Sequence, residues 1–283
     1  MSSITVRNMS KTFGRRKAAL HEVSLDIAPG EMVALIGASG SGKSTLIRLI
    51  AGLLNGDGID RGRIEVDGCC MQQGGRLVRN ATALRRDISV VFQQFNLVDR
   101  LPVLTNVLVG LLGRIPAFRG TLGLFTRAEK LAAMHALARV GIHETARQRA
   151  STLSGGQQQR AAISRALVQE AKVLLADEPI ASLDPASAKS VMETLARINQ
   201  EDGITVLVSL HQVEYARRYC SRTVALRDGS VAYDGPSAAL TLDFLRDIYG
   251  EASEELILPD APAWAPPKYR PARPAPQPAL VGV

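Results

Sequence analysis

One stretch constrains the fold of this chain more than any other part of it, Gly37-Ala38-Ser39-Gly40-Ser41-Gly42-Lys43-Ser44-Thr45. It matches the phosphate-loop pattern G-x-x-x-x-G-K-[ST], and it stands between apolar segments at 32–36 and 46–51. That order predicts a strand, a loop and a helix. The glycines let main-chain N–H groups close around phosphates, and the positive end of the helix faces the same anion. We therefore expect a nucleoside triphosphate here, with Lys43 at its β- and γ-oxygens and the Ser44 hydroxyl on Mg²⁺.

The composition is that of an ordinary globular chain, and its 283 residues allow one or two domains. No apolar run reaches membrane-spanning length and the N-terminus lacks a charged-then-apolar leader, so we expect a cytoplasmic chain unless a partner carries it to a membrane. The cysteines, Cys69, Cys70 and Cys220, suit neither a metal site nor a disulfide framework. The net charge is +7, but the basic residues are scattered and aromatics make up only 4%, so we expect no nucleic-acid partner.

A glutamine closes the last predicted strand of the first third of the chain. Residues 4–27 alternate like two paired strands, and Phe13 stands before the turn between them, where it would either stack on adenine or pack at the strand end. A helical stretch at 77–86 precedes a β-branched run at 88–92, which we interpret as a buried strand. Gln93 follows that run, and a glutamine at the carboxyl end of such a strand can reach a metal or an attacking water.

The apolar spacing becomes helical from residue 104 to about 150, which predicts a helical subdomain inserted into an α/β core. Its middle, 115–125, reads as a loop and carries Phe118 and Phe125 beside an arginine. Exposed apolar groups there would suit a protein partner near a membrane, and packing against the neighbouring helices is the equal alternative.

The segment Leu153-Ser154-Gly155-Gly156-Gln157 opens another helix. Ser154 is a good N-cap, and the glycines leave backbone N–H groups free at a positive helix end, which makes a second anion site. The chain already has a phosphate loop for its own triphosphate. We therefore expect this helix start to serve the nucleotide of another subunit.

Two carboxylates and a histidine complete the polar groups at strand ends. Asp177 and Glu178 follow an apolar strand, and Asp177 can hold Mg²⁺ together with Ser44. Glu178 would project the other way because side chains alternate along a strand, so that it faces a water and acts as general base. His211 follows the buried strand at 204–210, at the same edge, and we interpret it as a γ-phosphate contact rather than a structural histidine.

These motifs, in this order, resemble the nucleotide-binding subunit of an ATP-binding cassette (ABC) transporter, including Ser182-Leu183-Asp184 between Glu178 and His211. The resemblance covers nearly all of residues 4–250. It implies an α/β fold with a phosphate-loop ATPase core, namely a RecA-like mixed sheet with an antiparallel β subdomain, and an inserted α-helical subdomain at about 97–168. We expect this domain to span 1–258, followed by a disordered tail at 259–283 that holds eight of the fourteen prolines.

The resemblance also implies cofactors, roles and partners. ATP and Mg²⁺ would bind at a head-to-tail homodimer interface, each ATP held by one subunit's phosphate loop and by the other's Ser154, Gly155, Gly156 and Gln157, with Asp184 nearby. Phe13 would stack on adenine, Gln93 or its neighbour Gln94 would reach the metal or water, Glu178 would be the base and His211 the γ-phosphate sensor. Transmembrane permease subunits and, through them, a periplasmic substrate-binding protein would be partners. The chain would then lie peripherally on the cytoplasmic face of the inner membrane.

The transported substrate is suggested by resemblance alone. The stretches 92–98, 177–185 and 210–216 resemble the ATPase subunits of bacterial phosphonate importers, and so does the insertion with Phe118 and Phe125. Phosphite or another oxyanion is the nearest alternative cargo. A soluble ABC assembly factor that works without a permease is the alternative from another class of protein, and a nucleic-acid-dependent ATPase is a more distant one.

Overall fold

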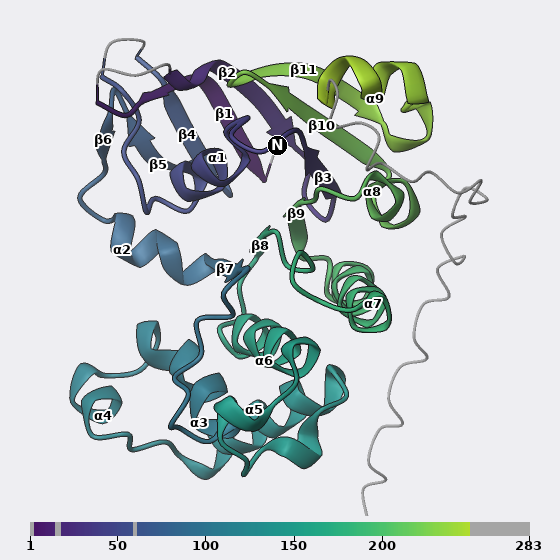
Figure 1. Ribbon diagram of the computed structural model, residues 1–283. Helices are drawn as coiled ribbons and strands as arrows, with labels where there is room; N and C mark the ends of the chain where they lie inside the picture. The colour runs from purple at the N-terminus through teal and green to yellow at the C-terminus, as the bar shows by residue number, and fades with distance from the viewer. Residues whose placement is uncertain (1–2, 15–17, 59–60, 250–283) are drawn as a thin grey trace, which may run out of the picture.

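The computed structural model describes residues 3–14, 18–58 and 61–249, which form two lobes (Figure 1). The larger lobe contains both β-sheets, and the smaller one is helical. The predicted tail at 259–283 and most of the turn at 14–17 lie outside the described residues. Within the described part of the chain, no helix has both the length and the apolar character needed to cross a membrane.

A six-stranded sheet forms the centre of the larger lobe, in the order β11-β10-β3-β9-β8-β7. The five strands from β10 to β7 are parallel, and β11 is antiparallel to β10. Every residue of β3, β9 and β8, three of the four inner strands, is buried, which explains their largely apolar sequences. The strands are β3 (Met32–Ile36), β7 (Ile88–Phe92), β8 (Val173–Asp177), β9 (Thr205–Ser209), β10 (Arg222–Arg227) and β11 (Ser230–Pro236).

The second sheet is antiparallel and has the order β2-β1-β4-β5-β6. The predicted pairing within residues 4–27 is confirmed, with Ile4 opposite Ile27. The helical stretch predicted over 77–86 is confirmed from Ala81 onward, where a short α-helix and a 3-10 turn follow each other, but its start is wrong. Gly74 and Gly75 both have positive φ and turn the chain back into a strand that ends at Leu77. The strands are β1 (Ile4–Thr12), β2 (Ala18–Ile27), β4 (Arg63–Val66), β5 (Cys69–Gln73) and β6 (Arg76–Leu77).

The central sheet separates two hydrophobic cores, because alternate residues of each strand point to opposite faces. On β3, Val33 and Leu35 belong to the core shared with α1 (Lys43–Ile50) and the antiparallel sheet. Ala34 and Ile36 belong to the core shared with the helical lobe and with α7 (Pro185–Asp202). The remaining elements of the larger lobe are α2 (Ala81–Leu84), η1 (Arg85–Asp87), α8 (Val213–Tyr219), η5 (Ser237–Ala239) and α9 (Leu242–Tyr249).

The helical lobe is inserted between β7 and β8 (Figure 1). Residues 115–125, expected to be a loop, contain the short helix α4, which begins after Pro116, where the fixed φ of proline suits a helix start. A capping box between Thr126 and Glu129 starts the next long helix. The elements of this lobe are α3 (Val103–Leu108), η2 (Val109–Gly113), α4 (Ala117–Thr121), α5 (Arg127–Arg139), η3 (His143–Thr145), η4 (Ala150–Thr152) and α6 (Gly155–Val168).

Candidate nucleotide-binding and catalytic site

Four neighbouring parallel strands end at one edge of the central sheet, and a predicted site residue follows each of them within two positions. Gly37 comes after β3, Glu178 after β8 and Gln93 after β7, while His211 lies two residues beyond β9. Because the strands are neighbours in the order β3-β9-β8-β7, their carboxyl ends meet, which is where open α/β sheets bind ligands. The sheet order therefore brings together residues that are far apart in the sequence.

The phosphate loop passes so close to neighbouring backbone that two of its positions have room only for glycine. A Cβ atom on Gly37 would lie 2.3 Å from the Leu226 carbonyl oxygen, and one on Gly42 would lie 2.4 Å from that of Ala19. Both glycines also have positive φ, 148° and 105°. The Ser41 hydroxyl is buried and has no hydrogen-bond partner among the described residues. The loop thus has the shape of an anion cradle, and the Ser41 hydroxyl is available to a ligand. Both features fit a bound phosphate.

Lys43 lies inside this loop with only 4% of its surface exposed. Its ammonium donates to the carbonyl oxygen of Gly37 at 2.7 Å and to that of Ala38 at 3.3 Å. Burial lowers the pKa of Lys43, although Glu178 and Asp177 act in the opposite direction. The Glu178 carboxylate is 4.0 Å away, so the cation lies between the loop carbonyls and the strand-end carboxylates.

Asp177 is buried and accepts two hydroxyl hydrogen bonds on Oδ1, from Ser44 at 2.8 Å and from Ser209 at 3.1 Å. Hydroxyl and carboxylate oxygens are the ligands that Mg²⁺ prefers, and Mg²⁺ in nucleotide sites uses few protein ligands beside phosphates. Within the described ranges, no group of three or more His, Cys, Asp or Glu side chains could hold a metal ion by itself. The donor set thus fits a magnesium ion shared with a nucleotide, rather than an all-protein metal cage.

Glu178 is oriented by two contacts and not by strand alternation, so the expectation based on alternation is wrong. The strand β8 ends at Asp177, and Glu178 has a left-handed backbone with φ of 51°. Its N–H donates to the Ser209 hydroxyl at 2.8 Å, and its Oε1 accepts from His211 Nε2 at 2.6 Å. The carboxylate is thus held between a histidine and the Lys43 ammonium, at the edge where we predict the attacking water.

Gln93 and Gln94 are both exposed just after the end of β7. The last residue of that strand, Phe92, pairs with Asp177 of the neighbouring strand β8. The chain after them is held by Arg165 of α6, which donates to the backbone carbonyl of Asn96 at 2.8 Å. Burial lowers the pKa of Arg165. Both glutamines are exposed and follow the same strand, so the choice between them stays open.

The start of α6 is built as the sequence predicts. Ser154 and Gln157 form a reciprocal capping box, in which the Ser154 hydroxyl accepts from the Gln157 N–H at 3.3 Å. The helix start packs closely on α7, since a Cβ atom on Gly156 would lie 2.7 Å from Ser187 Cβ. Asp184 caps α7, and its hydrogen bonds with Ser187 lower the pKa of its carboxyl group. Ser154 and Asp184 thus lie at the starts of two adjoining helices of the same chain.

Phe13 follows β1, and half of its surface is exposed. The Lys11 ammonium lies 5.4 Å from its ring centroid, within the range of a cation–π contact. The exposed ring is available for stacking, and its role toward adenine stays a prediction.

Sequence reasoning missed Ser209, whose hydroxyl joins the predicted metal ligand Asp177 to the backbone of Glu178. A serine at the last position of an otherwise apolar buried strand was the available signal. It also missed Arg165, for which the sequence carries no signal because its partners lie about 70 residues away.

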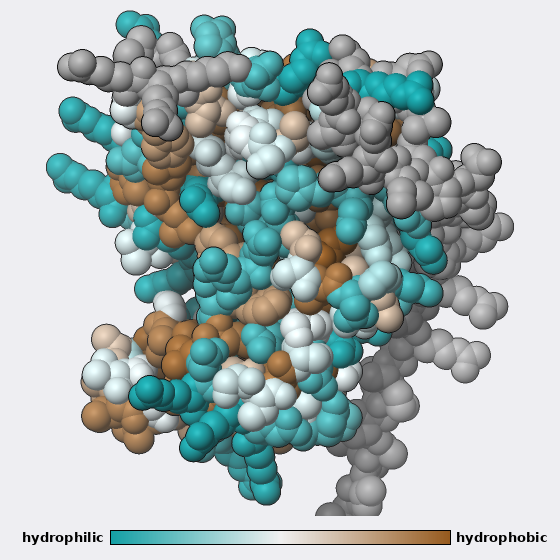
Figure 2. Space-filling model, in the orientation of Figure 1, coloured by the Kyte–Doolittle hydropathy of each residue, from teal (hydrophilic) through white to brown (hydrophobic). Residues whose placement is uncertain are grey.

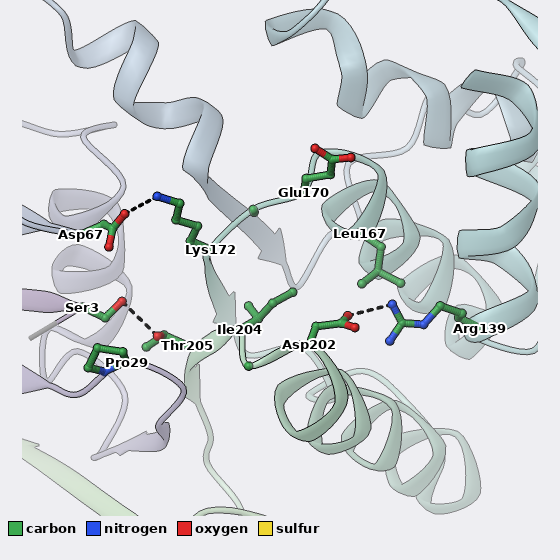
Figure 3. Close-up of a pocket in the computed structure, with 12 residues that line it drawn as sticks. Ser3, Pro29, Asp67, Arg139, Leu167, Glu170, Lys172, Asp202, Ile204 and Thr205 are labelled. Carbon is green, nitrogen blue, oxygen red and sulfur yellow. Dashed lines mark hydrogen bonds and ion pairs between the residues drawn. The ribbon is translucent and has the colours of Figure 1, made fainter. Parts of the chain in front are cut away.

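The opposite edge of the sheet contains a cavity of about 520 Å³, lined by residues such as Pro29, Lys172 and Thr205 that precede or begin the strands (Figure 3). Its cations already have partners. Lys172 is bound to Asp67, and Arg139 is bound to Asp202 at 2.8 Å. This cavity lies at the other end of the strands from the phosphate loop. Because its cations are already paired, it is a poor site for an anion.

The fold and this site define a phosphate-loop ATPase with an inserted helical lobe. Residues 20–181 match the sequence model of the family described as ABC transporter, and the chain belongs to that family as an ATP-binding subunit. The predicted fold class is confirmed, since a dimeric ATP-binding cassette in a post-hydrolysis state with ADP and Pi has a TM-score of 0.71 and 34% sequence identity, over 84% of this chain and 100% of that one. CbiO1 from Clostridium perfringens has a TM-score of 0.70 and 27% identity, over 89% of this chain and 92% of that one.

Curated relatives are similar over nearly the whole chain. The phosphonates import ATP-binding protein PhnC 1 of Cupriavidus metallidurans is 59% identical over 93% of this chain and 93% of its own length. The phosphonates import ATP-binding protein PhnC of Stutzerimonas stutzeri is 60% identical over 91% of this chain and 93% of its own length.

Proposed function

We propose that this chain is the energy-coupling ATPase of an importer for phosphonates. The observation that carries the ATPase part is the gathering of Lys43, Ser44, Asp177, Glu178 and His211 at one edge of the sheet. The cargo part is supported by relatives that are 59–60% identical and are named phosphonate import proteins.

The site is proposed to work as a head-to-tail homodimer. The start of α6 is capped internally and packs on α7 of its own chain, while Ser154 itself is exposed. Its free backbone N–H groups therefore suit an anion that approaches from outside the chain. A second copy would supply that anion as its own bound ATP, and the dimeric cassette among the solved relatives supports this arrangement.

The chemistry assigned to the chain is hydrolysis of the γ-phosphate of ATP. Glu178 takes the proton of the attacking water, and His211, 2.6 Å from it, holds that carboxylate in place and contacts the γ-phosphate. Lys43 binds the β- and γ-oxygens, and Phe13 stacks on adenine. Bound Mg²⁺ would neutralise phosphate charge, and Ser44, Asp177 and Gln93 are the residues that would hold it.

The junction between the lobes provides a docking place for a permease. A cleft of about 330 Å³ there is lined by residues of α2, η1, η2 and α6, and it is rich in arginine: Arg85, Arg86, Arg114 and Arg165. Arg114 is paired with Asp87, whereas Arg85 and Arg165 bind backbone carbonyls, so the cleft has a positive excess. A permease segment that carries carboxylates would fit it.

An apolar patch lies on the same lobe, over α4 and its flanks (Figure 2). Its side chains are at least 43% exposed, and they are Leu112, Phe118, Leu122 and Leu124. The patch and the cleft together favour a membrane-protein partner, and hence a peripheral position on the cytoplasmic face of the inner membrane. A periplasmic substrate-binding protein would act through that permease.

The test is ATP hydrolysis by the complex of this chain with its permease and binding protein in lipid vesicles. Stimulation by alkylphosphonates, and not by phosphite or phosphate, is expected. Stimulation by phosphite alone would identify the alternative importer. Isolation from detergent extracts in a soluble complex without any membrane protein would overturn the transport assignment in favour of an assembly factor, and stimulation by DNA or RNA would favour a nucleic-acid-dependent ATPase.

A further inference from the structure

The last helix of the described chain ends on the phosphate loop. Tyr249 is the final residue of α9, and its hydroxyl oxygen accepts a hydrogen bond from the Gly37 N–H at 3.0 Å. Both groups are buried, and the tyrosine is 9% exposed. The two residues are 212 positions apart in the sequence.

The Gly37 N–H needs such a partner because the sheet does not supply one. The β3 ladder with β10 ends at the pair Ile36 and Ala225, one residue before Gly37. The backbone is enclosed at this point, since a Cβ on Gly37 would lie 2.3 Å from the Leu226 oxygen. A buried N–H without a partner is costly, so the Tyr249 hydroxyl stabilises this loop conformation.

The same residue is held on its other side by Lys43, whose ammonium donates to the Gly37 carbonyl at 2.7 Å. Under the function proposed above, Lys43 turns toward the β- and γ-phosphates when ATP binds. The hydrogen bond from Lys43 to the Gly37 carbonyl is then weakened. The hydrogen bond from the Gly37 N–H to Tyr249 does not involve the nucleotide. Tyr249 can therefore hold the start of the loop in both conditions.

The helix α9 is itself anchored, so the hydroxyl is fixed in position. Leu245 is 1% exposed in the core, and Phe244 contacts Tyr233 with ring centroids 5.0 Å apart. Burial raises the pKa of Tyr249 to about 12, so the phenol stays neutral at physiological pH.

We propose that Tyr249 is a positioning residue for the nucleotide: its hydroxyl fixes the first N–H of the phosphate loop, and α9 thereby sets the affinity of the loop for ATP. The proposal rests on ATP binding at this loop. It also gives α9 a means to influence the site without contacting the nucleotide.

The test compares Tyr249→Phe with the parent and with Tyr233→Phe, in the full chain. The control also removes a tyrosine hydroxyl near α9, one that donates to the Pro236 carbonyl at 2.8 Å, away from the loop. Without the hydroxyl, the empty loop can leave the binding conformation, and MgATP must then restore that conformation when it binds. One neutral hydrogen bond is worth roughly 1 kcal/mol, which corresponds to about fivefold in affinity. We expect the Kd and KM for MgATP to rise about fivefold in Tyr249→Phe, with kcat within about twofold of the parent. Tyr233→Phe should keep the parent values.

Hydrogen exchange of the phosphate-loop peptide without nucleotide provides a second measurement that does not depend on ATP. The Gly37 amide should exchange faster in Tyr249→Phe than in the parent and in Tyr233→Phe. Equal exchange and equal Kd would overturn the proposal while leaving the ATPase assignment intact. A fall in kcat at unchanged KM would also overturn it, and failure of the parent to bind MgATP would overturn both. If Tyr249→Phe does not fold, slow Gly37 exchange in the parent is required, and fast exchange there refutes the contact.

Discussion

Replacing Glu178 by Gln separates the chemical step from nucleotide binding. The amide keeps an oxygen that can accept from His211, which lies 2.6 Å from Glu178 Oε1. It also keeps the backbone contact with Ser209 at 2.8 Å. It loses the carboxylate that would take a proton from water. Phosphate and metal contacts through Lys43 and Ser44 are unchanged, so ATP should still bind.

The expected loss follows from the value of a positioned base. General-base catalysis contributes about 10²- to 10⁴-fold in rate, which corresponds to about 3 to 5 kcal/mol of activation free energy. The charge change has a second, smaller effect. Glu178 is the larger of the two carboxylate contributions that raise the pKa of Lys43, so its removal lowers that pKa further. We therefore expect Glu178→Gln to bind ATP more weakly than the parent at high pH, where Lys43 loses its charge, and equally well at neutral pH.

The assay is phosphate release under saturating MgATP, together with size-exclusion chromatography. Glu178→Gln should release phosphate about 10²- to 10⁴-fold more slowly than the parent and should elute as an ATP-dependent dimer. Glu144→Gln is the matched control, because Glu144 also lies beside a histidine, His143 at 3.6 Å, but on the exposed surface. Equal hydrolysis by Glu178→Gln and the parent would show that Glu178 is not the base.

Three further predictions concern the supports of the site. Ser209→Ala removes the partner of the Glu178 N–H and should lower the free energy of unfolding by about 1 to 3 kcal/mol, with reduced kcat; urea unfolding and phosphate release measure both, and parental values in both would contradict the role of the hydroxyl. Gly156→Ala places a Cβ 2.7 Å from Ser187 Cβ and should lower the free energy of unfolding by about 1 to 3 kcal/mol in thermal unfolding; an unchanged melting temperature would show that the two helices separate without loss. Deletion of 259–283 should leave ATPase activity intact, and a truncated chain that fails to fold would show that the tail is packed.

The inner strands could be predicted from the sequence because burial leaves a direct mark on them. Both faces of β3, β8 and β9 are covered, so each contains a continuous apolar stretch, with polar residues only at the ends of β8 and β9. The start of the helix predicted over 77–86 is placed too early for the opposite reason. That segment is short, and two glycines at positive φ in the preceding turn decide its course. The helix α4, five residues long, leaves too little periodicity to be recognised between 115 and 125.

Site residues could be predicted where a motif fixes them and could not where only the fold brings them together. The phosphate loop, Asp177 and His211 follow apolar runs whose strands are parallel neighbours, so their convergence follows from the sheet. The orientation of Glu178 could not be predicted, because it depends on a left-handed backbone held by Ser209, 31 residues away. Tyr249 carries no sequence signal at all, since its contact with Gly37 exists only after α9 has packed.

The Ser209 hydroxyl contacts both the proposed metal ligand, Asp177, and the backbone of the proposed base, Glu178. A hydroxyl has one proton to donate and lone pairs to accept, and here it donates to Asp177 at 3.1 Å while it accepts from the Glu178 N–H at 2.8 Å. Any shift of β9 against β8 therefore moves both groups together. Because His211 follows the same strand and binds Glu178, β9 fixes the base from two directions. The relative position of these two strands, more than any single side chain, should then decide whether the site is competent for hydrolysis.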